Sequence, residues 1–157
     1  MRVFAASLLL LACCANHQPS SHTSAATTAA HANELHATVT VEQQAPYGAY
    51  LTDDTGRTLY VFSADNRVAG RSACDLKCAA EWPPFMYEGD FKANGGASPS
   101  MLGKIKRPDG STQITYNRWP LYYDKDDRRP SQIHGENATA FGGRWLLISP
   151  QGAPIGK

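Results

Sequence analysis

The chain has 157 residues and a formal net charge of +1 at pH 7, from 15 Lys and Arg against 14 Asp and Glu. Because the two signs are interleaved along the chain, the sequence offers no basic face for nucleic acid or for anionic lipid. The part from about residue 45 onward is long enough for one domain with its own hydrophobic core.

Residues 1–12 have the pattern of a signal peptide. Arg2 supplies a positive charge, and Val3 to Ala12 is an unbroken run of apolar and small residues. This run is shorter than the roughly 20 residues of a membrane-spanning helix. The small residue before Cys13 resembles the end of a bacterial lipobox, in which the cysteine is lipidated and becomes the mature N-terminus. Ordinary secretion with cleavage after Ala15 is the alternative.

The residue that follows the lipobox indicates which membrane holds the anchor. The residue after Cys13 is Cys14 rather than an aspartate. This resembles the Gram-negative lipoproteins that are held in the outer membrane. We therefore expect a protein tethered by lipid to the bacterial cell envelope and facing the periplasm.

Residues 13–44 are predicted to form a flexible tether. They are dominated by Ala, Thr, Ser and His and hold almost no large apolar side chain. Such a segment buries too little surface to offset the entropy lost on ordering.

Four histidines lie in this tether, in two pairs whose members are five residues apart: His17, His22, His31 and His36. Mobile imidazoles are possible ligands for copper or zinc ions. Since no Cys, Asp or Met partner stands at ligand spacing, we favour a polar spacer over a metal site.

Residues 45–157 contain two similar segments, Leu51 to Asp65 and Ile114 to Asp127. Each has an apolar-Thr start, a polar turn, a Leu-Tyr pair followed within two residues by another aromatic residue, and an acidic end. Turn residues between β-branched and aromatic flanks predict a β-hairpin. The duplication predicts a mainly β domain in which two hairpin repeats, about residues 47–87 and 104–150, share one core.

One short helix is expected in the domain, from Ser72 to Glu81. Ser72 is a suitable N-cap, and Asp75 would lie in the first turn at the favourable end of the helix dipole. Pro83 and Pro84 prevent the helix from continuing.

Cys74 and Cys78 are predicted to form a disulfide, because close cysteines in an oxidising compartment usually pair. In a regular helix their Cα atoms would lie about 6.2 Å apart. That separation is near the long end of the disulfide range of roughly 4.4–6.8 Å, so we expect local distortion. A redox, copper or haem site is the alternative, although Ala79 stands where a c-type haem motif has histidine.

The segment Tyr60 to Asp65 fits the pattern Tyr, any residue, aromatic, two residues, Asp, with Phe62 as the aromatic. It resembles the predicted bacterial lipoproteins with a Yx(FWY)xxD motif, also described as a secreted repeat of unknown function. The second copy keeps Tyr122 and Asp127 but has an acidic residue at the aromatic position. The resemblance spans about residues 47–150 and implies an envelope location and a repeat architecture; it implies no activity.

Most aromatic side chains of the domain are expected in the core, since their strands have two apolar faces. Trp119 and Tyr123 are different, because they lie beside a hairpin turn and an acidic cluster, and they form the candidate ligand surface. Asp124, Asp126 and Asp127 are interpreted as a solvated polar turn rather than as a calcium or glycosidase site.

The function expected from the sequence is that of a lipid-anchored, non-enzymatic binding module for an unknown envelope protein or small ligand. No nucleophile in an elbow or triad context and no phosphate-binding glycine loop is found in the sequence. No bound cofactor is expected. The alternative is a periplasmic redox, copper or haem accessory protein that uses the cysteine pair or the histidines of the tether.

Overall fold

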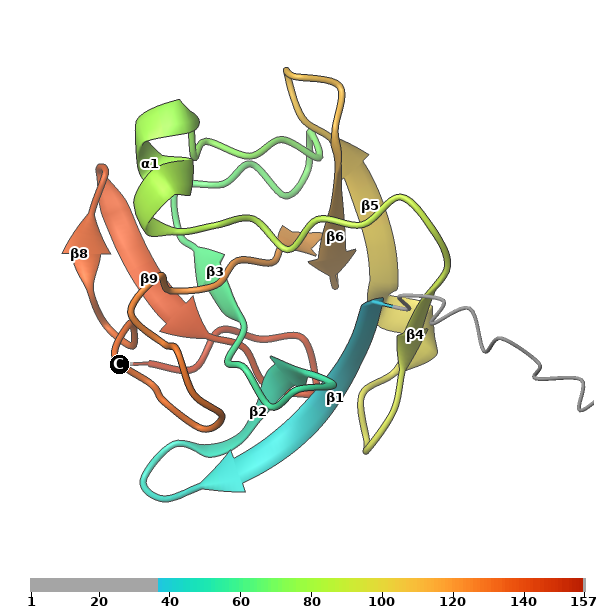
Figure 1. The fold of residues 1–157 in the computed structure, drawn as a ribbon, viewed down its shortest axis with the longest axis vertical. Helices are drawn as coiled ribbons and strands as arrows, with labels where there is room; N and C mark the ends of the chain where they lie inside the picture. Colours follow the sequence, from blue (N-terminus) through green and yellow to red (C-terminus); the bar gives the residue numbers. More distant parts are fainter. Residues whose placement is uncertain (1–36, 157) are drawn as a thin grey trace, which may run out of the picture. The chain divides into compact units, whose positions relative to one another are not determined.

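The computed structural model describes residues 37–156, and these form a mainly β fold with one short α-helix, as predicted. Figure 1 shows the arrangement. The elements in chain order are β1 Ala37–Gln44, β2 Gly48–Asp53, β3 Tyr60–Phe62, α1 Leu76–Glu81, β4 Phe91–Ala93, the 3-10 helix η1 Pro99–Met101, β5 Leu102–Lys106, β6 Thr112–Tyr116, β7 Trp119–Pro120, β8 Thr139–Ala140 and β9 Gly143–Leu147.

The strands form three small sheets, in the orders β2-β1-β4, β3-β9-β8 and β5-β6-β7. β1 pairs antiparallel with β2 and parallel with β4, whereas β3 pairs antiparallel with β9. β5 and β6 form a hairpin around the turn Pro108-Asp109-Gly110. Within residues 37–156, no helix is long and apolar enough to cross a membrane.

The predicted end of the tether is wrong, because residues 37–44 form β1. Ala37 and Val39 are buried in this strand, and Val41 packs against the same core. Six residue pairs join β1 to β2, from Val39–Asp53 to Gln44–Gly48. The alternating valines therefore belong to the sheet, although their Thr and Gln neighbours give the segment the composition of a spacer.

The two repeats exchange backbone hydrogen bonds reciprocally. The Tyr60 amide donates to the Tyr122 carbonyl at 2.8 Å, and the Tyr122 amide donates back to the Tyr60 carbonyl at 2.9 Å. A further backbone hydrogen bond joins the hairpin of each repeat to the last extended segment of the other repeat. Leu51 donates to the carbonyl of Ile148. Ile114 donates to the carbonyl of Phe85. The two repeats therefore share one core, as the duplication predicted.

The core has an aliphatic part and an aromatic part. The aliphatic part includes Val39, Leu51, Leu59, Val61, Ile114, Leu121 and Ile148, and the aromatic part includes Tyr60, Phe62, Trp82, Tyr122 and Trp145. Trp82 and Trp145 stand three residues before Phe85 and Ile148, so they occupy corresponding positions in the two repeats. Their rings stack at 4.0 Å between centroids with an interplanar angle of 1°.

The helix starts later than predicted. α1 begins at Leu76, and its N-cap is Asp75, whose carboxylate accepts hydrogen bonds from the amides of Lys77 and Cys78. Ser72 is not the N-cap, because its Oγ accepts from the Cys74 amide at 3.1 Å in a non-helical loop. Cys74 therefore precedes the helix.

The disulfide between Cys74 and Cys78 is present, as predicted, with the two Cα atoms 5.1 Å apart. This separation is below the value of about 6.2 Å for a regular helix because only Cys78 is helical. Both cysteines are buried. Closing so short a loop stabilises the fold by about 2 kcal/mol through the unfolded state.

Candidate ligand-binding pocket beside the disulfide

The motif residues of one repeat pair with those of the other. The Tyr60 hydroxyl donates to Asp127 Oδ2 at 2.6 Å, and the Tyr122 hydroxyl donates to Asp65 Oδ2 at 2.9 Å. All four residues are buried. Each Tyr and Asp of a motif therefore serves the opposite repeat, a pairing that the sequence did not predict.

Burial raises the pKa of Asp65 and of the two tyrosines. It raises the pKa of Asp65 to about 6, although the Ala73 amide, the Tyr122 hydroxyl and the charge of Arg107 act against it. Burial also raises the pKa of Tyr60 and of Tyr122, and the neighbouring Asp127 and Asp65 carboxylates add to the two shifts. Both tyrosines therefore stay protonated donors at neutral pH.

The second carboxylate oxygen of each motif Asp holds the loop that follows it. Asp65 Oδ1 accepts from the Ala73 amide at 2.7 Å, and Asp127 Oδ1 accepts from the His134 amide at 3.0 Å. The two motif pairs thus fix two corresponding loops, one carrying the disulfide and the other carrying His134.

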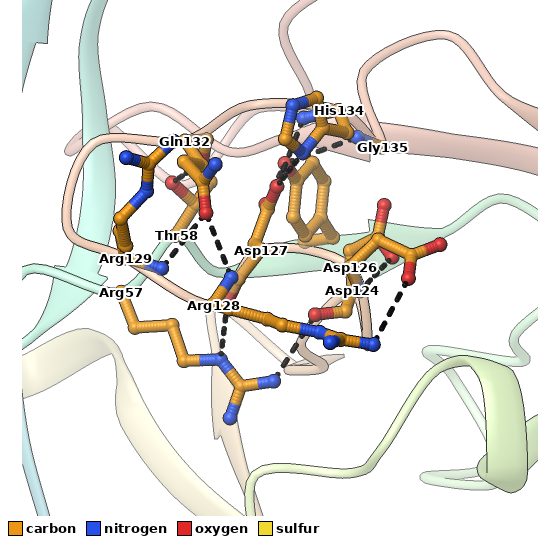
Figure 2. Close-up of polar contacts among 11 residues, drawn as sticks. Arg57, Thr58, Asp124, Asp126, Asp127, Arg128, Arg129, Gln132, His134 and Gly135 are labelled. Carbon is orange, nitrogen blue, oxygen red and sulfur yellow. Dashed lines mark hydrogen bonds and ion pairs between the residues drawn. The ribbon is translucent and has the colours of Figure 1, made fainter.

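Figure 2 shows the loop of the second repeat around Asp127. His134 Nδ1 lies 2.9 Å from Asp127 Oδ1, with the imidazole more than half exposed. Arg57 donates to the backbone carbonyls of Asp127 and Asp124 at 3.1 and 3.0 Å. Asp124 and Asp127 are buried while Asp126 is exposed, so the interpretation of all three as a solvated turn is wrong for two of them.

Phe62, the aromatic residue of the first motif, is completely buried and stacks on Trp145 at 4.3 Å. It is therefore a core residue and not part of a ligand surface. Asp124 occupies the corresponding position of the second repeat, and its Oδ1 accepts from the Asp126 amide.

Trp119 and Tyr123, the predicted ligand surface, are half-buried and each lies under an arginine. The Arg67 guanidinium lies 4.6 Å from the Trp119 ring centroid, and the Arg57 guanidinium lies 4.1 Å from that of Tyr123. The Tyr123 hydroxyl donates to Asp53 Oδ2. One face of each ring is therefore already covered by a cation.

The four tether histidines and Cys13 lie outside the described residues. Within residues 37–156, no group of three or more His, Cys, Asp or Glu side chains has an arrangement that could hold a metal ion.

A pocket of about 350 Å³ lies beside the disulfide, lined by residues 72–76 and 107–109. The first wall is the loop fixed by Asp65, and the Tyr122 hydroxyl reinforces it through a 2.7 Å hydrogen bond with Ser72 Oγ. The second wall is the turn between β5 and β6. The hydrogen-bonded pair of Tyr122 and Asp65 therefore supports the pocket directly.

Arg107 is the chemically distinctive residue of this pocket, and no sequence pattern singled it out. It is 9% exposed. Its guanidinium donates to the Cys74 carbonyl at 2.6 Å, to Gln113 Oε1 at 2.7 Å and to Ser72 Oγ at 3.0 Å. All three acceptors are neutral. The only advance signal would have been an arginine placed directly before a Pro-Asp-Gly turn.

Replacing Asp65 with Asn is expected to change how stability depends on pH. A carboxyl group whose pKa rises from 3.8 to about 6 on folding stabilises the protein at low pH, and this contribution is lost as pH rises through about 6. The free energy of unfolding of the wild type, minus that of D65N, should therefore fall by on the order of 2–3 kcal/mol between pH 4 and pH 7. Urea unfolding at a series of pH values measures the difference. A constant or rising difference would contradict the raised pKa.

A family model described as "secreted repeat of unknown function" matches the chain twice, at residues 42–86 and 103–148. Each match contains one Tyr–Asp motif together with its hairpin. No curated protein and no solved structure matches the chain. Since the two matched segments cover more than half of the sequence and coincide with the two halves that share the core, the chain belongs to this family of secreted repeats.

Proposed function

We propose that the protein is a lipid-anchored module of the bacterial envelope that binds a small ligand in the pocket beside the disulfide. The description of the family as secreted supports an envelope location. The apolar run that ends at Cys13 supports a lipid anchor, and Cys14 after it supports the periplasmic face of the outer membrane.

The observation that carries the binding role is the buried Arg107 in the wall of a pocket of about 350 Å³. This volume is near the lower end of the roughly 300–1,000 Å³ of known ligand sites, which are mostly apolar with a few placed polar groups. The pocket has this composition, because Ala73, Leu76 and Pro108 line it together with Arg107.

The binding role is proposed to be non-enzymatic. The two carboxylates in the pocket wall are engaged in local turns. Asp75 caps α1, and Asp109 accepts hydrogen bonds from the amide and hydroxyl of Ser111. These bonds lower the pKa of Asp109, which makes it a poor proton acceptor.

The lipid anchor predicts that Cys13→Ala releases the protein from the membrane. Without the thiol there is nothing to acylate, so the variant should appear in the soluble periplasmic fraction. Cys14→Ala is the matched control and should stay with the membrane. Globomycin should make the wild type accumulate as a larger precursor. Membrane fractionation and immunoblotting measure both effects, and equal behaviour of the two variants would disprove the anchor.

The pocket predicts where small molecules bind. In a fragment screen followed by amide chemical shifts of the purified protein, hits should perturb the amides of Ala73 and Asp75 in the first wall. They should leave the indole of Trp119 unchanged. Hits that gather instead at Trp119 and Tyr123 would show that the ligand surface is the one expected from the sequence.

A further inference from the structure

We propose that the ligand of this pocket is a small carboxylate with a compact apolar body, whose carboxylate binds the guanidinium of Arg107. The proposal rests on the proposed function of the pocket and adds the chemical class of the ligand.

Arg107 forms no ion pair with a carboxylate among the described residues, although its charge acts on Asp65 and Asp109 from a longer distance. Its three hydrogen-bond acceptors are a backbone carbonyl, an amide oxygen and a hydroxyl. A guanidinium has five N–H donors, so two of them have no acceptor among residues 37–156. A buried cation that is not hydrogen-bonded to a carboxylate is costly, and a carboxylate in the pocket would supply both the paired charge and two acceptors.

Asp65 is one candidate for an internal counter-ion of Arg107, but its carboxylate already accepts other donors. Its two oxygens are used by the Ala73 amide and the Tyr122 hydroxyl. It forms no ion pair with Arg107, and burial raises its pKa to about 6 in spite of the arginine charge. Arg107 therefore lines the pocket without a direct carboxylate partner among the described residues.

The surface around Arg107 adds positive charge. Arg71 and Lys106 line a second hollow of about 270 Å³ that shares Ser72, Arg107 and Pro108 with the pocket. The Arg71 side chain has no partner within residues 37–156, whereas Lys106 donates to Thr112 Oγ1 and lies 3.8 Å from Glu88. An anion that approaches the pocket therefore passes an unpaired arginine.

Asp75 and Asp109 are the negative charges in the wall, and both are exposed. Water screens exposed charges, while the charge of buried Arg107 is screened far less. Because both carboxylates also accept backbone amides, the balance at the base of the pocket favours an anion.

The apolar part of the ligand would lie against Leu76, which is 84% exposed at the pocket rim, and against Ala73 and Pro108. A large aliphatic side chain at the rim gains contact area when a ligand covers it. The pocket therefore selects an anion with a small hydrophobic body over a free inorganic anion.

The test is a titration of the purified protein with phenylacetate, phenylacetamide and 2-phenylethylammonium, followed by the Ala73 and Asp75 amide shifts. These probes have similar bodies and differ in charge. Phenylacetate is expected to bind at least about tenfold more tightly than the amide, because charge-assisted hydrogen bonds are the stronger kind. The ammonium probe should bind most weakly.

Three variants assign the roles of the side chains. Arg107→Met should abolish the preference for phenylacetate over phenylacetamide. Leu76→Ser should weaken both probes by similar factors. Val68→Ser is the matched control, because Val68 is an equally exposed aliphatic residue away from this pocket, and it should change neither affinity.

Each outcome decides between the two proposals. Equal affinities for acid and amide, with shifts in the pocket, would overturn the carboxylate and leave the pocket as a binding site. No pocket shift with any probe would overturn the pocket as well. If Arg107→Met does not fold, the comparison of the three probes on the wild type and on Leu76→Ser still decides.

Discussion

The fold depends on the reciprocal hydrogen bonds between each motif tyrosine and the aspartate of the other repeat. A buried carboxylate oxygen that lacks a donor is strongly destabilising, so each aspartate depends on the opposite tyrosine to satisfy one of its two oxygens. Tyr60 and Tyr122 also exchange backbone hydrogen bonds, which holds the two hydroxyls in register with Asp127 and Asp65. One repeat alone could form neither of these hydrogen bonds, because each joins a tyrosine of one copy to the aspartate of the other, and this explains physically why two copies occur in one domain.

The same interaction connects the core to the surface. Each aspartate uses its other oxygen to hold a loop, at Ala73 in the first repeat and at His134 in the second. The two loops then differ. The first carries the buried disulfide and, with Arg107, forms the pocket; the second carries an exposed imidazole against a buried carboxylate. The motif is therefore a structural device, and the difference between the repeats lies in what each loop presents.

The predictable features were those that depend on local sequence. The hairpins, the family motif and the Cys74–Cys78 disulfide followed from turn residues, alternation and cysteine spacing. The boundary of the tether was wrong because β1 is held by β2 and β4, and its own composition resembles a spacer. The helix start was wrong because Asp75, and not Ser72, caps the helix, while the Cys74 carbonyl before it accepts from Arg107, 33 residues away.

The candidate pocket was unpredictable for the same reason. Arg107 and Ser72 are 35 residues apart and meet in the fold, where Ser72 also bonds Tyr122 from the second repeat. No periodicity or motif in the sequence indicates that the Tyr60 hydroxyl bonds to Asp127 rather than to Asp65 of its own repeat. The sequence identifies the residues of the motif, and the fold decides which of them pair.

A double-mutant cycle measures this pairing most directly. The cycle compares Tyr60→Phe with Asp127→Asn, across the repeats, and Tyr60→Phe with Asp65→Asn, within one motif, by urea unfolding at neutral pH. The reciprocal arrangement predicts a coupling free energy on the order of 1.5–3 kcal/mol for the first pair. It predicts no more than about 0.5 kcal/mol for the second. A larger coupling within the motif than across the repeats would contradict it.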